Sequence, residues 1–326
     1  MLFEIEECCF AHTTNSSDLL GLVKAVLRGC HGVLVVDESA ADYTTWLERQ
    51  TEEIREEWSL ALASTARSQA RAPSSKTARV AHDADPNFQD DLLQIPPREA
   101  EKLSRHAFQI FVENDFADTN FLKAFANSDQ LETINELESQ GFVEFNHCGG
   151  ITEMPRRLSA RLQRHPANRH FIAAVFDSDS LEPQSPSNDA SSVMQCCEER
   201  NIPSFCLDRR AIENYLPVWA LSGWANCHRG KSRTRLIRAK DAFSRLSEAQ
   251  RNHYNLKSGL KGDGQRLSQT TWGQLEEKDR VPLLGGFGRQ VANLFGEPHV
   301  RDNLSAKDSG WQEVNGVVVA ILGLVR

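Results

Sequence analysis

The feature that most constrains the fold is an alternation of short apolar runs with segments of helical periodicity, which begins near residue 99. The apolar runs FQIFVEN, GFVEFNHCGGI, HFIAAVFDSDS and IPSFCLDRR have the length and composition of buried strands. Between them, QLETINELESQ, MPRRLSARLQRH and SSVMQCCEERN place apolar residues at helical intervals. This alternation predicts an α/β fold, in which a mostly parallel sheet carries helices on both faces.

The same patterns divide the chain into four parts. Residues 1–65 combine the helical segment DLLGLVKAVLRG with the strand CHGVLVVDE and predict a small α/β domain. Residues 66–98 are polar with Pro and Ser, which predicts a linker. The alternating pattern occupies residues 99–225, and residues 226–326 predict a basic, mainly helical extension that completes the second domain.

Composition favours a cytoplasmic protein. No apolar run approaches the roughly 20 residues of a membrane helix, and the N-terminus lacks the order of a signal peptide. The eight cysteines contain no CxxC pair, so neither a disulfide framework nor a zinc site is predicted. Most of these cysteines are expected to be small buried residues.

A local basic strip stands out against the net charge of −8. Residues 228–240, HRGKSRTRLIRAK, are rich in Lys and Arg and contain no acid. Such a strip holds a phosphate backbone even on an acidic protein. The alternative is a solvated helix face. The candidate nucleic-acid contacts here are Arg229, Lys231, Arg233, Arg235 and Arg238.

Acidic residues follow two of the predicted strands directly. Glu113 ends the first strand of the second domain, and Asp177 and Asp179 end the third. The carboxyl ends of parallel strands share one edge of a sheet, and in an extended segment residues two apart project to the same side. Crowded carboxylates repel one another unless a cation relieves them, and hard oxygen ligands suit Mg²⁺ or Mn²⁺. The alternative is that DxD only caps a helix or binds solvent.

In their order, these elements resemble a TOPRIM domain, and most closely the small OLD-like TOPRIM nucleases of bacterial phage defence. The resemblance covers roughly residues 105–325. It rests on a glutamate after the first strand, glycines after the second and DxD after the third, followed by three further elements. The matching segments are VENDFADTNFL, HCGGI, VFDSDS, CLDRRAIENYLP, YNLKSGLKGD and LLGGFGRQVANLF.

The resemblance implies roles for individual residues. Glu113, Asp177 and Asp179 would bind the catalytic Mg²⁺ or Mn²⁺, with Asp118 as an additional acid. Glu213 would bind a second ion or fix the geometry; the alternative is that it pairs with Arg209 or Arg210.

Three basic positions complete the implied site. Lys257 would stabilise charge on the phosphate, with Lys261 as substitute. Arg209 and Arg210, just after a strand end, are expected to contact phosphate or carboxylate groups, and we count them among the candidate nucleic-acid contacts.

The implied function is metal-dependent endonuclease cleavage of DNA or RNA by an effector of antiviral defence. The chain contains no GxxxxGK[ST], so a separate ATPase subunit is an expected partner, and a homo-oligomer is possible. The alternatives are a non-catalytic assembly subunit, or a nuclease whose chemistry lies in the N-terminal domain.

The N-terminal segment CHGVLVVDESAADYTTWLERQ resembles part of a PIN-like ribonuclease domain. Asp37 and Glu38 are the candidate acids there, with Asp18 or Asp42 as further members. Where an aspartate is expected on the first strand, the sequence has CFAHTT. That departure favours a degenerate, partner-binding domain, and a small α/β domain without chemistry is the alternative.

Overall fold

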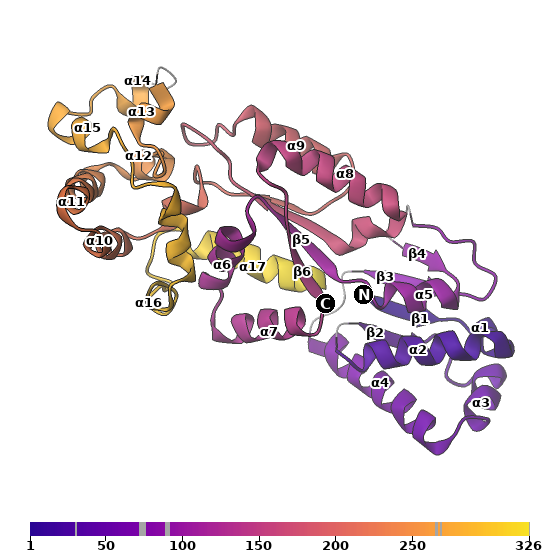
Figure 1. The fold of residues 1–326 in the computed structure, drawn as a ribbon. Coiled ribbons are helices and arrows are strands. Elements are labelled where there is room, and N and C mark those ends of the chain that lie inside the picture. The colour runs from indigo at the N-terminus through magenta and orange to yellow at the C-terminus, as the bar shows by residue number, and fades with distance from the viewer. Residues whose placement is uncertain (30, 72–75, 89–91, 265–266, 268, 326) are drawn as a thin grey trace.

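The computed structural model describes the chain except for residues 30, 72–75, 89–91, 265–266, 268 and 326. Two separate four-stranded sheets organise the described residues, and every strand pair in them is parallel. Helices surround both sheets (Figure 1). The prediction of an α/β fold with parallel sheets and a helical extension is therefore confirmed.

The first sheet has the order β2-β1-β3-β4. Its central strands β1 and β3 bury their apolar residues, with Phe3, Ile5 and Val80 inaccessible to solvent, whereas Arg79 on β3 is exposed. The elements of this part are β1 (Leu2–Ile5), α1 (Cys8–Ala11), η1 (Thr13–Asn15), α2 (Ser16–Val26), β2 (Gly32–Val35), α3 (Ala41–Glu48), α4 (Glu52–Arg71), β3 (Thr77–Val80), β4 (Leu92–Ile95) and α5 (Pro97–Leu103).

The predicted linker over residues 66–98 is wrong. Strands β3 and β4 both lie within it and pair in the first sheet, and α5 packs against α2 and β3. Strands of four residues flanked by polar sequence give too little periodicity to be recognised, although Ala78 and Val80 are fully buried. Residues 72–75 and 89–91 of the predicted linker lie outside the described residues. The first α/β unit thus extends to about residue 103.

The strand assignment at the N-terminus also needs correction. The first strand is β1, LFEI, and CFAHTT belongs instead to α1, η1 and the residue between them. An acid does follow this strand: Glu6 comes directly after Ile5 and forms a 3.1 Å ion pair with Arg79. An acid was predicted to be missing from the first strand only because CFAHTT was assigned to that strand.

The second sheet has the order β6-β5-β7-β8. Central strands β5 and β7 are buried along their whole length, as their sequence, apolar except for Gln109, predicts. The elements here are β5 (Phe108–Val112), α6 (Asp115–Ala124), α7 (Ser128–Ser139), β6 (Val143–His147), η2 (Ile151–Glu153), α8 (Met154–Arg164), η3 (Pro166–Phe171), β7 (Ile172–Phe176), α9 (Asn188–Glu198) and β8 (Ser204–Cys206).

Helices cover both faces of this sheet (Figure 1). One face carries α8 and α9, and a separate apolar cluster that includes Phe111, Met154 and Phe176 fills the space beneath them. The other face carries α6 and α7, against which the C-terminal helix α17 (Trp311–Val325) packs. The apolar run NGVVVAILGLV belongs to this helix.

The remaining helices form a separate cluster at the end of the molecule away from the first sheet (Figure 1). They follow η4 (Ile212–Tyr215) and comprise α10 (Val218–Cys227), α11 (Gly230–Arg245), α12 (Glu248–His253), α13 (Leu260–Asp263), α14 (Gln269–Trp272), α15 (Glu277–Leu283), η6 (Arg289–Gly296) and α16 (Pro298–Arg301). No helix among the described residues has the length and apolar character needed to cross a membrane.

Candidate metal and nucleic-acid site

The site begins where the order of the parallel strands in the second sheet switches from one side of β5 to the other. The connection from β5 leads to β6 on one side, whereas β7 lies on the other side and leads on to β8. In open parallel sheets, ligands bind at the carboxyl ends of strands flanking such a point. Glu113 follows β5 directly and Asp177 follows β7, and the Asp177 N–H donates a 2.9 Å hydrogen bond to Glu113 Oε1. The expected meeting of these two strand ends is confirmed.

The glycine turn after β6 fixes the backbone of Glu113. The N–H groups of Gly149 and Gly150 both donate to the Glu113 carbonyl oxygen, at 3.1 and 3.2 Å. Their φ angles of 81° and 113° lie in the region that favours glycine. A side chain here would impose strain, so the double glycine is what allows two N–H groups to converge on one carbonyl.

The DxD segment is not extended, contrary to the prediction. Asp177 is buried, and its Oδ1 accepts a 2.9 Å hydrogen bond from the Ile212 N–H. Asp179 is exposed and has a φ of 48°, a left-handed conformation that Asp tolerates better than most residues. The Asp179 N–H donates to the Arg210 carbonyl oxygen at 2.9 Å. Pairing with the neighbouring loop thus turns the chain, and the two carboxylates occupy different environments.

Two further predicted acids lie beside this pair. Asp118 is buried on α6, and its Oδ2 accepts a 2.7 Å hydrogen bond from the Asn114 N–H. Glu213, on η4, is 1% exposed and lies 3.0 Å from the Lys257 ammonium. Neither carboxylate oxygen of Glu213 has an aligned hydrogen-bond donor among the described residues. The alternative pairing of Glu213 with Arg209 or Arg210 does not occur; the partner is Lys257.

Burial and mutual repulsion disfavour the charged carboxylates. Burial raises the pKa of Glu113 to about 7, and the charges of Asp118 and Asp179 add to this effect. Burial likewise raises the pKa of Asp118 to about 6, with Glu213 contributing. The pKa of Asp177 is raised well above its ordinary value, first by burial and then by Glu113 and Glu213. The protein itself therefore leaves negative charge at this edge incompletely neutralised.

Lys257 is the cation that opposes this charge. Burial disfavours its ammonium, but the carboxylates of Glu213, Asp177 and Glu113 outweigh that effect and raise the Lys257 pKa. Lys257 consequently stays protonated at neutral pH. Its position agrees with the predicted role as a source of positive charge in the site.

The donor set fits a divalent cation chemically, since hard carboxylate oxygens are the ligands of Mg²⁺ and Mn²⁺. The best single indication is Glu213, a buried carboxylate without an aligned donor. Across the part of the chain that is described, however, no three His, Cys, Asp or Glu side chains are grouped closely enough to hold a metal ion. Hydrogen bonds to backbone N–H groups already engage one oxygen each of Glu113, Asp118 and Asp177.

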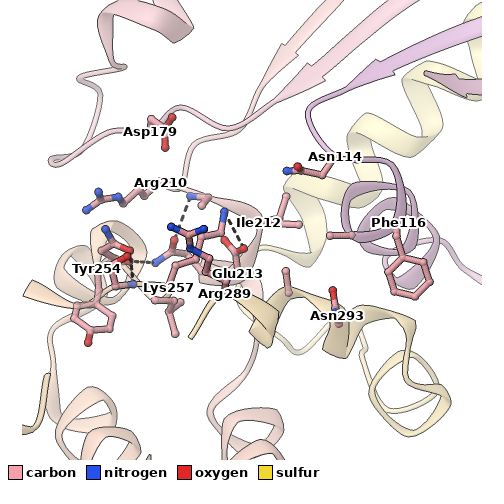
Figure 2. A pocket seen from close by; sticks show the side chains of 17 residues that line it. Asn114, Phe116, Asp179, Arg210, Ile212, Glu213, Tyr254, Lys257, Arg289 and Asn293 are labelled. Atoms are coloured by element: carbon pink, nitrogen blue, oxygen red, sulfur yellow. Dashed lines mark hydrogen bonds and ion pairs between the residues drawn. The ribbon is translucent and has the colours of Figure 1, made fainter. Parts of the chain in front are cut away.

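A cleft of about 560 Å³ opens beside these acids (Figure 2). Its walls come from the start of α6, the loop after β7, η4, the segment after α12 and the start of η6. Glu113, Asp118 and Asp177 are not among its lining residues; Glu213 and Lys257 connect the buried acids to it. The lining side chains that bear on function are Phe116, Asp179, Glu213, Lys257, Arg289 and Asn293.

The structure corrects the assignment of Arg209 and Arg210 as nucleic-acid contacts. Arg210 forms a bidentate ion pair with the buried Asp263, at 2.7 and 2.6 Å. Arg209 is also buried, donates to the Asn214 carbonyl and the Ser309 hydroxyl, and stacks on the Tyr215 ring. Both guanidinium groups hold the loop after β8 in place. Arg210 thus matches the expected carboxylate contact, but with a partner from a distant segment.

The predicted basic strip forms helix α11 and the two residues before it, and its five candidate cations are all exposed. Lys231, Arg235 and Arg238 line a groove of about 800 Å³ between α11 and α15. Arg235 also donates a 2.7 Å hydrogen bond to the Gly286 carbonyl. Arg229 and Arg233 lie outside this groove, and Lys261 lines neither the groove nor the cleft.

The N-terminal candidates do not assemble into a site. Asp37 follows edge strand β2, and its Oδ1 accepts from both the N–H and the hydroxyl of Ser39, at 2.8 and 2.6 Å. The Ser39 hydroxyl lowers the Asp37 pKa, as expected for an exposed carboxylate in a turn. Neither Asp37 and Glu38 nor the further candidates Asp18 and Asp42 belong to a metal-holding group among the described residues.

Sequence reasoning missed the cleft residues Phe116, Arg289 and Asn293. Arg289 comes directly after Gly288 in the segment LLGGFGRQVANLF, so its place beside a glycine turn was a usable signal. Phe116 and Asn293 carried no comparable signal, because only the packing of α6 against η6 brings them to the same cleft.

Comparison with known proteins gave no relatives: no family model, no curated protein and no solved structure matches this chain.

Proposed function

We propose that this protein is an Mg²⁺- or Mn²⁺-dependent endonuclease that cleaves nucleic-acid phosphodiester bonds at the carboxyl edge of its second sheet. The observation that carries the proposal is the buried carboxylate cluster of Glu113, Asp118, Asp177 and Glu213, which faces one ammonium group, that of Lys257. A structural cluster of acids would be paired or kept exposed. A cluster left short of positive charge is typical of a cation site.

The residues divide into two roles under this proposal. Glu113, Asp177 and Glu213 would hold the metal, with Asp118 and Asp179 nearby; their side chains would have to move closer together than they stand in this structure. When bound, the metal would supply a nucleophilic hydroxide and stabilise negative charge on the phosphate. Lys257 has a raised pKa, so it is unsuited to accept a proton and instead offers fixed positive charge to the phosphate. A substrate phosphate would also compete for Lys257 and release Glu213 from their ion pair.

The basic groove supplies a route by which a nucleic-acid backbone reaches the cleft. Residues 284–289 connect the two: Leu284 and Gly285 line the groove, and Arg289 lines the cleft. The Gly288 N–H donates to the Lys257 carbonyl at 3.1 Å, so this segment is attached directly to the site. Binding along Lys231, Arg235 and Arg238 would weaken as salt increases.

The test is cleavage of single-stranded DNA, plasmid DNA and total RNA by the purified protein with Mg²⁺, Mn²⁺ or EDTA. We expect Asp177→Asn to abolish metal-dependent cleavage. Asp129→Asn, which changes an exposed carboxylate on α7, should not. Cleavage that persists undiminished in Asp177→Asn would refute this site, and equal loss in both variants would point to a nonspecific effect.

A non-catalytic binding subunit is the second candidate, and the ion pair between Glu213 and Lys257 favours it because that pair leaves Glu213 without need of a metal. This candidate predicts that Glu113→Gln leaves cellular toxicity or protection unchanged. A role in phage defence and a separate ATPase partner belong to the nuclease proposal through the resemblance to OLD-like TOPRIM proteins. Repeating the cleavage assay with an ATPase encoded nearby distinguishes an inactive subunit from a nuclease that requires its partner.

A further inference from the structure

Phe116 occupies an unusual position for a large aromatic side chain. It is 62% exposed, the most exposed of the large hydrophobic residues in the described part of the chain. Phe121 of the same helix and Phe125 directly after it are 1% and 0% exposed and belong to the core. Phe116 therefore contributes little to packing, and leaving its ring in water has no evident structural purpose.

The ring lies on the wall of the cleft described above (Figure 2). Gly296 supports one edge of it, since a Cβ atom at Gly296 would stand 3.1 Å from Phe116 Cζ. The absence of a side chain at Gly296 thus gives the ring its space. Phe116 comes three residues after Glu113, so the ring and the Glu113 carboxylate are carried by the same strand-to-helix turn.

Polar side chains on the walls of the same cleft suit a nucleotide. Asn293 and Arg289 line this cleft and are exposed, and Asn114, which precedes α6, lines it too. Amide groups form hydrogen bonds with base edges, and a guanidinium group binds phosphate. A cleft whose walls carry an aromatic ring, amides and a cation has the composition of a surface that stacks a base and holds its phosphate.

We propose that Phe116 is the stacking platform for an unpaired base, which makes single-stranded nucleic acid the substrate class of this site. The inference rests on the proposed nuclease function. The cleft has room for such a base, because pockets of roughly 300–1,000 Å³ hold small-molecule ligands and this cleft measures about 560 Å³. In a duplex both faces of a base are already stacked, whereas an unpaired base offers one to Phe116.

The experiment measures binding of short fluorescein-labelled strands by anisotropy, with the full-length protein and Ca²⁺ in place of Mg²⁺. Phe116→Ala should weaken binding of a single strand roughly 5- to 100-fold, the range of losing one base-aromatic stack. Phe116→Tyr should retain affinity within about twofold, and Phe116→Leu should lose it because it keeps the apolar character but not the aromatic face. Val319→Ala, which removes an exposed apolar group on α17, should have no effect.

A second readout isolates stacking from any change in folding. In a series of strands, each strand lacks one base, and the position of the missing base differs from strand to strand. The wild type should bind one strand of the series less tightly than the others, whereas Phe116→Ala should bind all of them equally. Duplex binding should be unaffected by Phe116→Ala.

Two negative results have different meanings. If the wild type binds and cleaves nucleic acid but Phe116→Ala binds single strands equally well, the stacking role is refuted and the nuclease proposal stands. If the wild type neither binds nor cleaves any strand or duplex, both proposals fail.

Discussion

The carboxylate cluster predicts that the metal-free protein loses stability as pH rises. In the folded state the pKa of Glu113 is raised from 4.5 to about 7, first because the carboxyl group is buried. The folded protein therefore binds more protons than the unfolded chain between these values, and its free energy of unfolding falls with increasing pH. The contribution is favourable below pH 4.5 and is lost as the pH rises through about 7.

The magnitude follows from the two pKa values. A rise from 4.5 to about 7 corresponds to about 3 kcal/mol in total, most of which is lost between about pH 5 and pH 8. Asp118, with its pKa raised to about 6, and Asp177 act in the same direction. Lys257 opposes all three, because its charge lowers their pKa values.

The assay is urea unfolding, followed by circular dichroism in EDTA over about pH 5 to 8, the window set by the folded and unfolded pKa values. Glu113→Gln should reduce the loss of stability over this pH range by about 2–3 kcal/mol, because the amide does not ionise. Glu132→Gln, an exposed position on α7, should follow the wild type. Adding Mn²⁺ at the high-pH end should restore stability to the wild type and less to Glu113→Gln, because a bound cation stabilises the folded state.

The refuting result is a Glu113→Gln curve parallel to that of the wild type. It would mean that Glu113 ionises in the folded protein at its ordinary pKa, and that the cluster is already neutralised or hydrated. A cation at this edge would then have no excess negative charge to neutralise.

Three other predictions follow from single contacts. Arg210→Met should destabilise the protein by about 3–5 kcal/mol because it leaves the buried Asp263 carboxylate unpaired. If urea denaturation showed a loss in the free energy of unfolding of less than about 1 kcal/mol, water would be replacing the ion pair. Gly259→Ala should cost about 3 kcal/mol or more, since its Cβ would lie 2.3 Å from the Gly286 nitrogen. Gly288→Ala, where φ is also positive but no atom lies within 4 Å, should cost only about 1 kcal/mol; equal melting temperatures for the two would contradict the packing argument. Lys257→Met should move the loss of stability to higher pH, because the carboxyl pKa values rise without the ammonium. An unchanged dependence of stability on pH would mean that Lys257 does not interact electrostatically with the carboxylates.

Part of the site could be predicted from sequence because it depends on local pattern. The burial of β5 and β7 follows from runs that are apolar except for Gln109, and an acid after each run must lie at the carboxyl edge of a parallel sheet. The double glycine after β6 similarly predicted a turn, and its N–H groups do hold the Glu113 carbonyl. Local pattern failed for β3 and β4, whose four-residue strands are too short for periodicity to outweigh the polar residues around them.

The amino-acid sequence by itself determined the α/β class, the edge of the sheet at which the acids gather, and the exposed basic helix. The tertiary structure decided which charges remain available. Arg210 is neutralised by Asp263, 53 residues away, and Glu213 meets Lys257 from a segment beyond α12. The packing of α6 against η6 likewise placed Phe116, Arg289 and Asn293 in one cleft. Periodicity reports only which face of an element is buried, whereas the partner of a buried charge depends on segments that meet only when the chain has folded.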